Sequence, residues 1–234
     1  MLIRVGQERT EKINLALAGM LATIAGALNA AGFLAAGVFT ANMTGNVSAF
    51  ADTLVTGEIA VALWLLPLVF TFILGAYCAA ILVLRGLAKK VRGAFAWAIV
   101  LEALLLAALS IGMTLTDGKI SEVLMTVSLS FVLGFQNSVT TLISEARVRT
   151  THVSGMATDI GVGLASLFGD RENRKDASAK LKLHSLTLSS FAIGGIAGAI
   201  AFNWAGAWFF AMAAAALLLV GWPELLRARR TPWE

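Results

Sequence analysis

The chain has 234 residues, of which 58% are hydrophobic and 14% are charged, and its mean hydropathy is +0.82. So large an apolar content excludes a single soluble domain and predicts an integral membrane protein surrounded by the lipid bilayer. The formal net charge of +4 does not indicate nucleic-acid binding, because membrane topology and anionic lipid account for the basic residues.

Six stretches are long and apolar enough to cross about 30 Å of hydrocarbon, which takes about 20 helical residues. They are much longer than the alternating strands of about 10 residues in a membrane β-barrel. The sequence therefore predicts an all-α integral membrane protein with about six transmembrane helices. The expected spans are residues 14–37, 59–84, 94–114, 121–143, 184–203 and 205–222.

Two polar segments that contain glycine follow the first and fourth spans. They are Thr40-Ala-Asn-Met-Thr44-Gly45, called the first break below, and Thr150-Thr-His-Val-Ser154-Gly155, called the second break. In membrane proteins such interruptions mark places where the backbone leaves the helix, and solute sites are built there. The two breaks therefore point to a location for a functional site.

The breaks belong to an internal repeat. Gly26-x-x-Asn29 corresponds to Gly134-x-x-Asn137, and matches between later spans follow in the same order, including Thr71–Ile81 with Ser190–Ile200. Each copy holds three spans, so the second copy enters the bilayer with the opposite orientation. We predict a single membrane domain, 1–234, built as an inverted 3+3 repeat, with repeat one at about 14–114 and repeat two at about 121–222.

The glycines of the matched segment in spans two and five are expected to allow close helix contacts. Gly75-x-x-x-Ala79 and Gly194-Gly195-x-x-Gly198 have the spacing of small residues at helix crossings. These contacts would join either the two halves of the chain or two subunits.

Basic residues are concentrated in four segments, which hold 15 of the 18 Lys and Arg residues: 1–12, 85–92, 171–182 and 227–230. The positive-inside rule places all four on the cytoplasmic side, with 85–92 and 171–182 as basic loops. We therefore expect a multi-pass protein of the bacterial cytoplasmic (inner) membrane with both termini in the cytoplasm. Complete crossings by the breaks would violate this rule, so two re-entrant or broken helical segments are expected, one entering from each side.

The solute site is predicted where the two breaks approach each other. Each break leads into helix-compatible sequence, and the N–H groups and dipole of a helix start favour an anion or another polar solute. The amides Asn29 and Asn137 could line this site or simply hydrogen bond between helices. Arg149 could clamp an acidic group or anchor the chain at the cytoplasmic surface. The substrate-binding candidates are Asn29, Thr44, Gly45, Asn46, Asn137, Arg149, Thr151, His152, Ser154 and Gly155.

Three acidic residues, Asp52, Glu102 and Asp159, are candidates for proton or ion coupling. A carboxylate at membrane depth costs about 2.5–3.5 kcal/mol on insertion scales, so it is seldom without a role. Two alternatives remain open at this point. Asp52 could be hydrated at the outer interface, and Asp159 could pair with an arginine or a helix end.

Enzymatic and metal sites are not expected. The sequence contains no Gly-x-Ser-x-Gly or phosphate-binding loop, and its single cysteine, Cys78, falls inside a span. His152 and His184 have no further ligands at a useful spacing, and His184 falls at the membrane edge. We therefore expect no catalytic residues, no metal and no cofactor.

Both breaks and their surroundings resemble the YoaK family of bacterial integral membrane proteins. The resemblance rests on Phe33–Asn46, Gly134-Phe-Gln-Asn137 and Val148–Asp159. It implies a multi-span membrane protein in which the two break motifs are important, and it supplies no substrate. His152 and Ser154 stand where the family pattern leads us to expect an aromatic residue and threonine.

These observations predict a small secondary transporter or permease for a small polar solute, with an anion favoured and with proton coupling as one mechanism. The alternatives are a passive channel, or a membrane scaffold or enzyme without transport activity. A homodimer is one way for so short a chain to shield a polar pathway from lipid.

Overall fold

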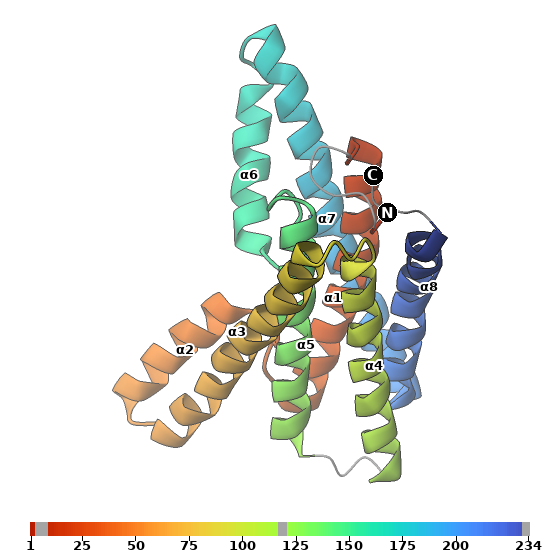
Figure 1. Cartoon of the computed structure of the whole chain (residues 1–234). Coiled ribbons are helices and arrows are strands. Elements are labelled where there is room, and N and C mark those ends of the chain that lie inside the picture. Colours follow the sequence, from red (N-terminus) through yellow and green to blue (C-terminus); the bar gives the residue numbers. More distant parts are fainter. Residues whose placement is uncertain (3–8, 117–120, 231–234) are drawn as a thin grey trace.

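The computed structural model describes residues 1–2, 9–116 and 121–230, and these residues form eight α-helices without any strand (Figure 1). The helices are α1 (Glu11–Ala36), α2 (Met43–Thr56), α3 (Ile59–Ala88), α4 (Ala94–Leu115), α5 (Glu122–Ile143), α6 (Val153–Ser166), α7 (Arg171–Ala205) and α8 (Trp208–Arg230).

Six of these helices, α1, α3, α4, α5, α7 and α8, are long and apolar enough to cross a membrane. The prediction of an all-helical membrane protein with six spans is therefore confirmed at this level. The chain is a multi-pass membrane protein by the length and composition of its helices. In Figure 1 the start of α1, the α3–α4 connection and the end of α8 lie at the upper end of the bundle.

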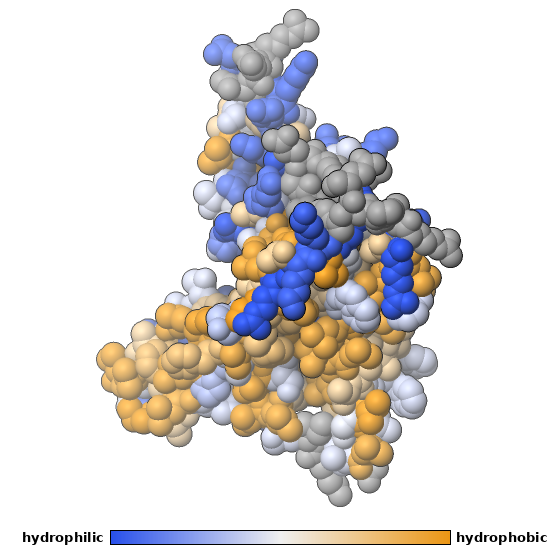
Figure 2. Space-filling model, viewed as in Figure 1, coloured by the Kyte–Doolittle hydropathy of each residue, from blue (hydrophilic) through white to orange (hydrophobic). Residues whose placement is uncertain are grey.

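The two remaining helices, α2 and α6, begin inside the predicted breaks. Each packs on the next helix along the chain, so that α2 pairs with α3 and α6 pairs with α7. In Figure 1 both pairs extend away from the central bundle, in different directions. Their surfaces differ, because α2 and the adjoining part of α3 are largely hydrophobic, whereas the projecting part of α6 and α7 is largely hydrophilic (Figure 2).

The basic segment 171–182 is not a loop, contrary to the sequence-based expectation, because α7 already begins at Arg171. Its alanines and long-chain polar residues favour a helix, and packing against α6 supports that conformation. The predicted loop at 85–92 is also shorter than expected, since α3 continues to Ala88. The charge of these segments predicts a side of the membrane and carries no information about their local structure.

The central bundle is held by three principal helix pairs: α1 with α7, α3 with α5, and α4 with α8. The closest approach of α1 and α7 is made by glycines. A Cβ atom on Gly26 would overlap the carbonyl oxygen of Phe191, and one on Gly194 would overlap the carbonyl oxygen of Thr23. Only the absence of these side chains allows the two backbones to touch.

The crossing of α3 and α5 has the same construction. A Cβ on Gly75 would overlap the carbonyl oxygen of Phe131, and a Cβ on Gly134 would overlap that of Phe72. These glycines therefore join helices from the two halves of the sequence within one chain, which was one of the two arrangements expected from their spacing.

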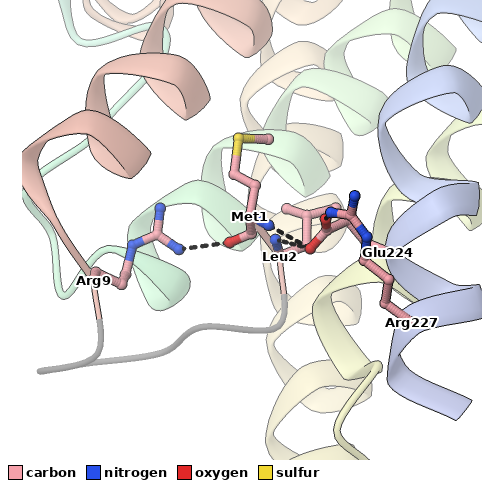
Figure 3. A network of polar contacts seen from close by, with 5 residues as sticks. All are labelled: Met1, Leu2, Arg9, Glu224 and Arg227. Atoms are coloured by element: carbon pink, nitrogen blue, oxygen red, sulfur yellow. Dashed lines mark hydrogen bonds and ion pairs between the residues drawn. The ribbon is translucent and has the colours of Figure 1, made fainter. Parts of the chain in front are cut away.

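The first residues of the chain tie the start of α1 to the end of α8 (Figure 3). The amino group of Met1 and the N–H of Leu2 both donate to Oε2 of Glu224, the latter at 2.8 Å. Arg9 donates to the carbonyl oxygen of Met1 at 3.2 Å, and Arg227 donates to Glu224 at 2.8 Å. This polar network therefore connects the start of α1 to the end of α8 at the upper end of the bundle.

The turn after α5 contains two consecutive residues with positive φ, Glu145 at 53° and Ala146 at 61°. This conformation costs an L-residue about 1–2 kcal/mol, and glycine adopts it readily. We expect Ala146→Gly to raise the free energy of unfolding by about 1 kcal/mol, measured by titration with SDS in mixed micelles. In the exposed helical position Ala157 the same change should instead lower it by about 1 kcal/mol. Equal losses at both positions would contradict this interpretation of the turn.

Candidate functional site

The polar side chains of the first break hold its own backbone. Asn29 of α1 accepts a hydrogen bond from the N–H of Ala41 at 2.8 Å, and Asn46 donates to the carbonyl oxygen of Phe39 at 3.1 Å. Both asparagines are buried. Their amides are therefore used in fixing the path of the chain between α1 and α2.

A serine of α5 fastens the same break to the bundle. Ser130 is fully buried, and its hydroxyl lies 3.0 Å from the carbonyl oxygen of Thr40 and 2.8 Å from that of Leu68 in α3. At the start of α2, Asn42 accepts a hydrogen bond from the N–H of Gly45 at 3.0 Å. This side-chain cap occupies a backbone donor that a solute would otherwise use.

The turn that leads from α5 into the second break is held by a comparable anchor. Ser144 accepts from the N–H of Val148 at 2.9 Å and donates to the carbonyl oxygen of Thr140 at 2.6 Å. His152 occupies the N-cap position of α6 without a capping hydrogen bond, and its ring lies where a Cβ of Gly155 would be. The absence of a side chain at Gly155 thus makes room for the imidazole.

A cleft of about 1160 Å³ opens beside this second break, between α6, α7 and the start of α1. Four of its lining residues were predicted from the sequence as site residues: Arg149, His152, Gly155 and Asp159. The remaining charged or polar lining residues were not, and they are Glu11, Asn14, Arg147, Thr158, Ser166, Asp176, Lys180, His184 and Thr187. The cleft is therefore polar and contains charges of both signs.

Arg149 differs from two other basic residues that line the cleft, Arg147 and His184. Arg147 lies 3.6 Å from Glu145, and His184 lies 3.6 Å from Asp159. Within the described part of the chain, no hydrogen bond or ion pair engages the exposed guanidinium of Arg149. Its planar guanidinium can therefore donate two hydrogen bonds to a carboxylate or phosphate from solution without breaking an internal contact.

His184 of α7 also lines the cleft. It lies on the wall opposite α6, and its Nε2 is 3.6 Å from Oδ2 of Asp159, a contact that is an ion pair only when the imidazole is protonated. Lys182 of the same helix binds Glu11 of α1, another residue of the cleft lining, at 3.1 Å. Helical periodicity over 171–184 could have revealed that Lys180 and His184 share a face four residues apart.

Arg9 adds positive charge close to the cleft. Burial lowers the pKa of Arg9 to about 10, with a further contribution from the charge of Arg147. The group consequently stays protonated at neutral pH. Its Nε donates to Asn14, a lining residue of the cleft, at 2.7 Å.

A comparison with known families gives one match, which covers most of the chain. A family model described as "Protein of unknown function (DUF1275)" matches residues 17–222. The chain belongs to the DUF1275 family. This match is consistent with the resemblance carried by the two break motifs, and it attaches no activity to them. No curated protein and no solved structure matches the chain.

In this DUF1275 chain the other predicted site residues do not line the cleft. Thr44, Gly45 and Asn46 are in the first turn of α2, and none of them lines it. Thr151 and Ser154 are close to His152 in the chain but do not line the cleft. Oδ1 of Asn137 is buried and has no partner among the described residues. The structure thus places His152 and Gly155 of the second break at the cleft and leaves the first break outside it.

The three predicted coupling residues of the DUF1275 chain also occupy different environments. Asp159 lines the cleft, whereas Asp52 is exposed on α2. Glu102 is fully buried on α4 and accepts a hydrogen bond from Gln136 of α5 at 2.7 Å. Over residues 9–116 and 121–230, no group of three or more His, Cys, Asp or Glu side chains is arranged to hold a metal ion.

Proposed function

We propose that this DUF1275 protein is a small secondary transporter or permease that binds a small solute with an acidic group in the cleft at the second break. The observation that carries the proposal is the position of Arg149. Its guanidinium lines a cleft of about 1160 Å³ and has no internal partner among the described residues. Membrane transporters commonly form their solute sites at broken helices.

The chemistry of the cleft suits a solute that carries an acidic group. Arg149 would bind the acidic group through two parallel hydrogen bonds, and Lys180 adds a second cation that lines the cavity. The ring of His152 offers a further polar contact beside Gly155. Asp176 is an acid on the same lining, so the rest of the solute can carry a donor or a positive group.

Of the three coupling candidates, Asp159 is best placed to link proton movement to solute binding. It shares the cleft with Arg149 and lies 3.6 Å from His184. Protonation of His184 would turn this contact into an ion pair, whereas protonation of Asp159 would remove its negative charge, and either change would alter the field at Arg149. Neither Asp52 nor Glu102 lines the cleft.

The inverted 3+3 repeat forms part of the same proposal, and the helix contacts support it. The crossing of α1 with α7 uses Gly26 and Gly194, and the crossing of α3 with α5 uses Gly134 and Gly75. Exchanging the two repeats converts one crossing into the other. The pairs α2–α3 and α6–α7 are related in the same way.

We further propose that the upper end of the bundle faces the cytoplasm of a bacterial inner membrane. The α3–α4 connection, the start of α1 and the end of α8 lie together at that end, and they include three of the four basic segments (Figure 1). The cleft would then open toward the cytoplasm. A homodimer remains part of the proposal, as a way to cover the exposed apolar face of α2 and α3.

The test is solute binding by the purified protein, with inorganic phosphate and a panel of small mono- and dicarboxylates as probes. We expect at least one probe to raise the melting temperature, and Arg149→Gln to weaken its binding about tenfold to hundredfold. Arg149→Lys should recover only part of the affinity, because a point charge replaces the fork. Arg229→Gln, which removes an exposed charge from α8, is the matched control. Equal affinities for the Arg149→Gln and Arg229→Gln proteins would overturn the proposal.

Transport itself is measured with the same probe in proteoliposomes. A coupled transporter gives saturable flux that responds to an imposed pH gradient. Flux without saturation and without a response to the gradient would identify a passive channel. Binding without any flux would favour a membrane scaffold or enzyme.

A further inference from the structure

A second hollow lies between α3 and α4, with α5 beside it. It has a volume of about 580 Å³ and is lined mainly by apolar side chains. Phe131 and Phe135 of α5 contribute to its lining, and α3 packs closely on α5 but only sparsely on α4. The hollow, called the α3–α4 groove below, is independent of the cleft at Arg149.

The groove narrows at its upper end. There a Cβ atom on Gly86 would lie 2.7 Å from Cβ of Ala94, so α3 and α4 nearly touch. Along α4 the lining residues extend from Ala94 to Leu105, which is about 17 Å at the helical rise of 1.5 Å per residue. This length is close to half of the hydrocarbon thickness of about 30 Å. The groove thus reaches from one membrane surface to about the middle of the bilayer.

Charge is confined to the surface end of the groove. Arg85 and Lys89 are exposed lining residues, and the lining contains no acidic side chain. Figure 2 shows the corresponding hydrophilic patch at the upper end of α3, directly above a hydrophobic surface. An occupant must therefore combine a negatively charged head with an apolar tail.

One aromatic side chain lines the groove near the basic residues. Trp97 is 46% exposed, and its indole N–H makes no hydrogen bond within the described residues. Indoles prefer the level of lipid headgroups, where the ring is apolar and the N–H can donate to ester or phosphate oxygens.

We propose that the α3–α4 groove is a binding site for an anionic phospholipid of the leaflet at the basic end of the bundle. The phosphate lies between Arg85 and Lys89, Trp97 contacts the glycerol ester region, and one acyl chain follows α4 down to Leu105. Because bulk lipid is as apolar as the groove, the preference for this site comes from the headgroup. The two cations therefore determine which lipids bind.

The first test is native mass spectrometry of the detergent-purified full chain with added phosphatidylglycerol or phosphatidylcholine. We expect one phosphatidylglycerol to be retained per chain in preference to phosphatidylcholine. In the double variant Arg85→Gln/Lys89→Gln the preference for phosphatidylglycerol over phosphatidylcholine should fall about 25-fold. The double variant Lys175→Gln/Arg229→Gln removes the same charge from exposed positions outside the groove and should keep it. Equal losses in the two double variants would overturn the proposal.

The second test locates the acyl chain. Cys78 is the only cysteine of the chain and lines the groove, so bound lipid should slow its alkylation by a maleimide. Leu101→Trp, which fills the groove and leaves both cations in place, should abolish phosphatidylglycerol retention in the first test. Two results would refute the lipid assignment and reduce the site to a surface anion site. One is retention of phosphatidylglycerol by the Leu101→Trp protein. The other is displacement of bound phosphatidylglycerol by inorganic phosphate as effectively as by added lipid.

Discussion

Alanine in place of Gly26 is expected to lower the free energy of unfolding by about 3 kcal/mol. The added Cβ would overlap the carbonyl oxygen of Phe191, which belongs to the backbone of α7 and cannot move aside like a flexible side chain. The two helices would have to separate, and the packing along α1 and α7 would be lost over several turns. Titration with SDS in mixed micelles, followed by circular dichroism, measures the change.

Gly134→Ala provides an internal comparison, because its Cβ would overlap the carbonyl oxygen of Phe72 in α3. If the two halves of the chain are built alike, its effect should be similar to that of Gly26→Ala. Gly161 is the matched control, since no atom lies within 4 Å of a Cβ built there. Gly161→Ala in the exposed middle of α6 should stabilise the protein by about 1 kcal/mol. If Gly26→Ala lowered the free energy of unfolding no more than Gly161→Ala does, the close backbone contact would be contradicted.

The sequence was sufficient to predict the spans because hydrophobic length is a local property. The start of α3 at Ile59, that of α4 at Ala94 and the end of α5 at Ile143 all agree with expectation. The long start of α7 was missed for a related reason. Its first turns are charged and resemble a loop in hydropathy, although their residues favour a helix and packing against α6 supports it.

The candidate site was harder to predict, because it depends on which polar groups already have partners. Asn29 and Arg149 look equally suited to a solute in the sequence. In the structure Asn29 is engaged by the backbone of Ala41, whereas Arg149 faces a cleft. The contact from Ser130 to Thr40 links residues 90 positions apart, so no local pattern could show that the first break is fastened.

Loss of the amide at position 136 should have an effect as large as that of the glycine changes. Gln136 of α5 donates to Oε1 of Glu102 in α4 at 2.7 Å, and both side chains are fully buried. In the Gln136→Leu protein the buried carboxyl group of Glu102 loses this hydrogen bond, and water does not reach it to replace the lost partner. We expect a loss of about 3 kcal/mol in the free energy of unfolding, measured by the same SDS titration.

The geometry of this pair also predicts which changes are tolerated. Oε2 of Glu102 and Oε1 of Gln136 have no partner among the described residues, and a protonated carboxyl group would donate from the first to the second. Glu102→Gln can form the same two hydrogen bonds, so its stability should stay within about 0.5 kcal/mol of the native protein. Removing both polar groups in Glu102→Leu/Gln136→Leu should cost less than Gln136→Leu alone, because no buried polar group is left unpaired. Additive losses in this double-mutant cycle would show that the two side chains do not act as a pair. Non-additive losses, together with a stable Glu102→Gln protein, would identify the pair as a neutral hydrogen-bonded link between the two halves.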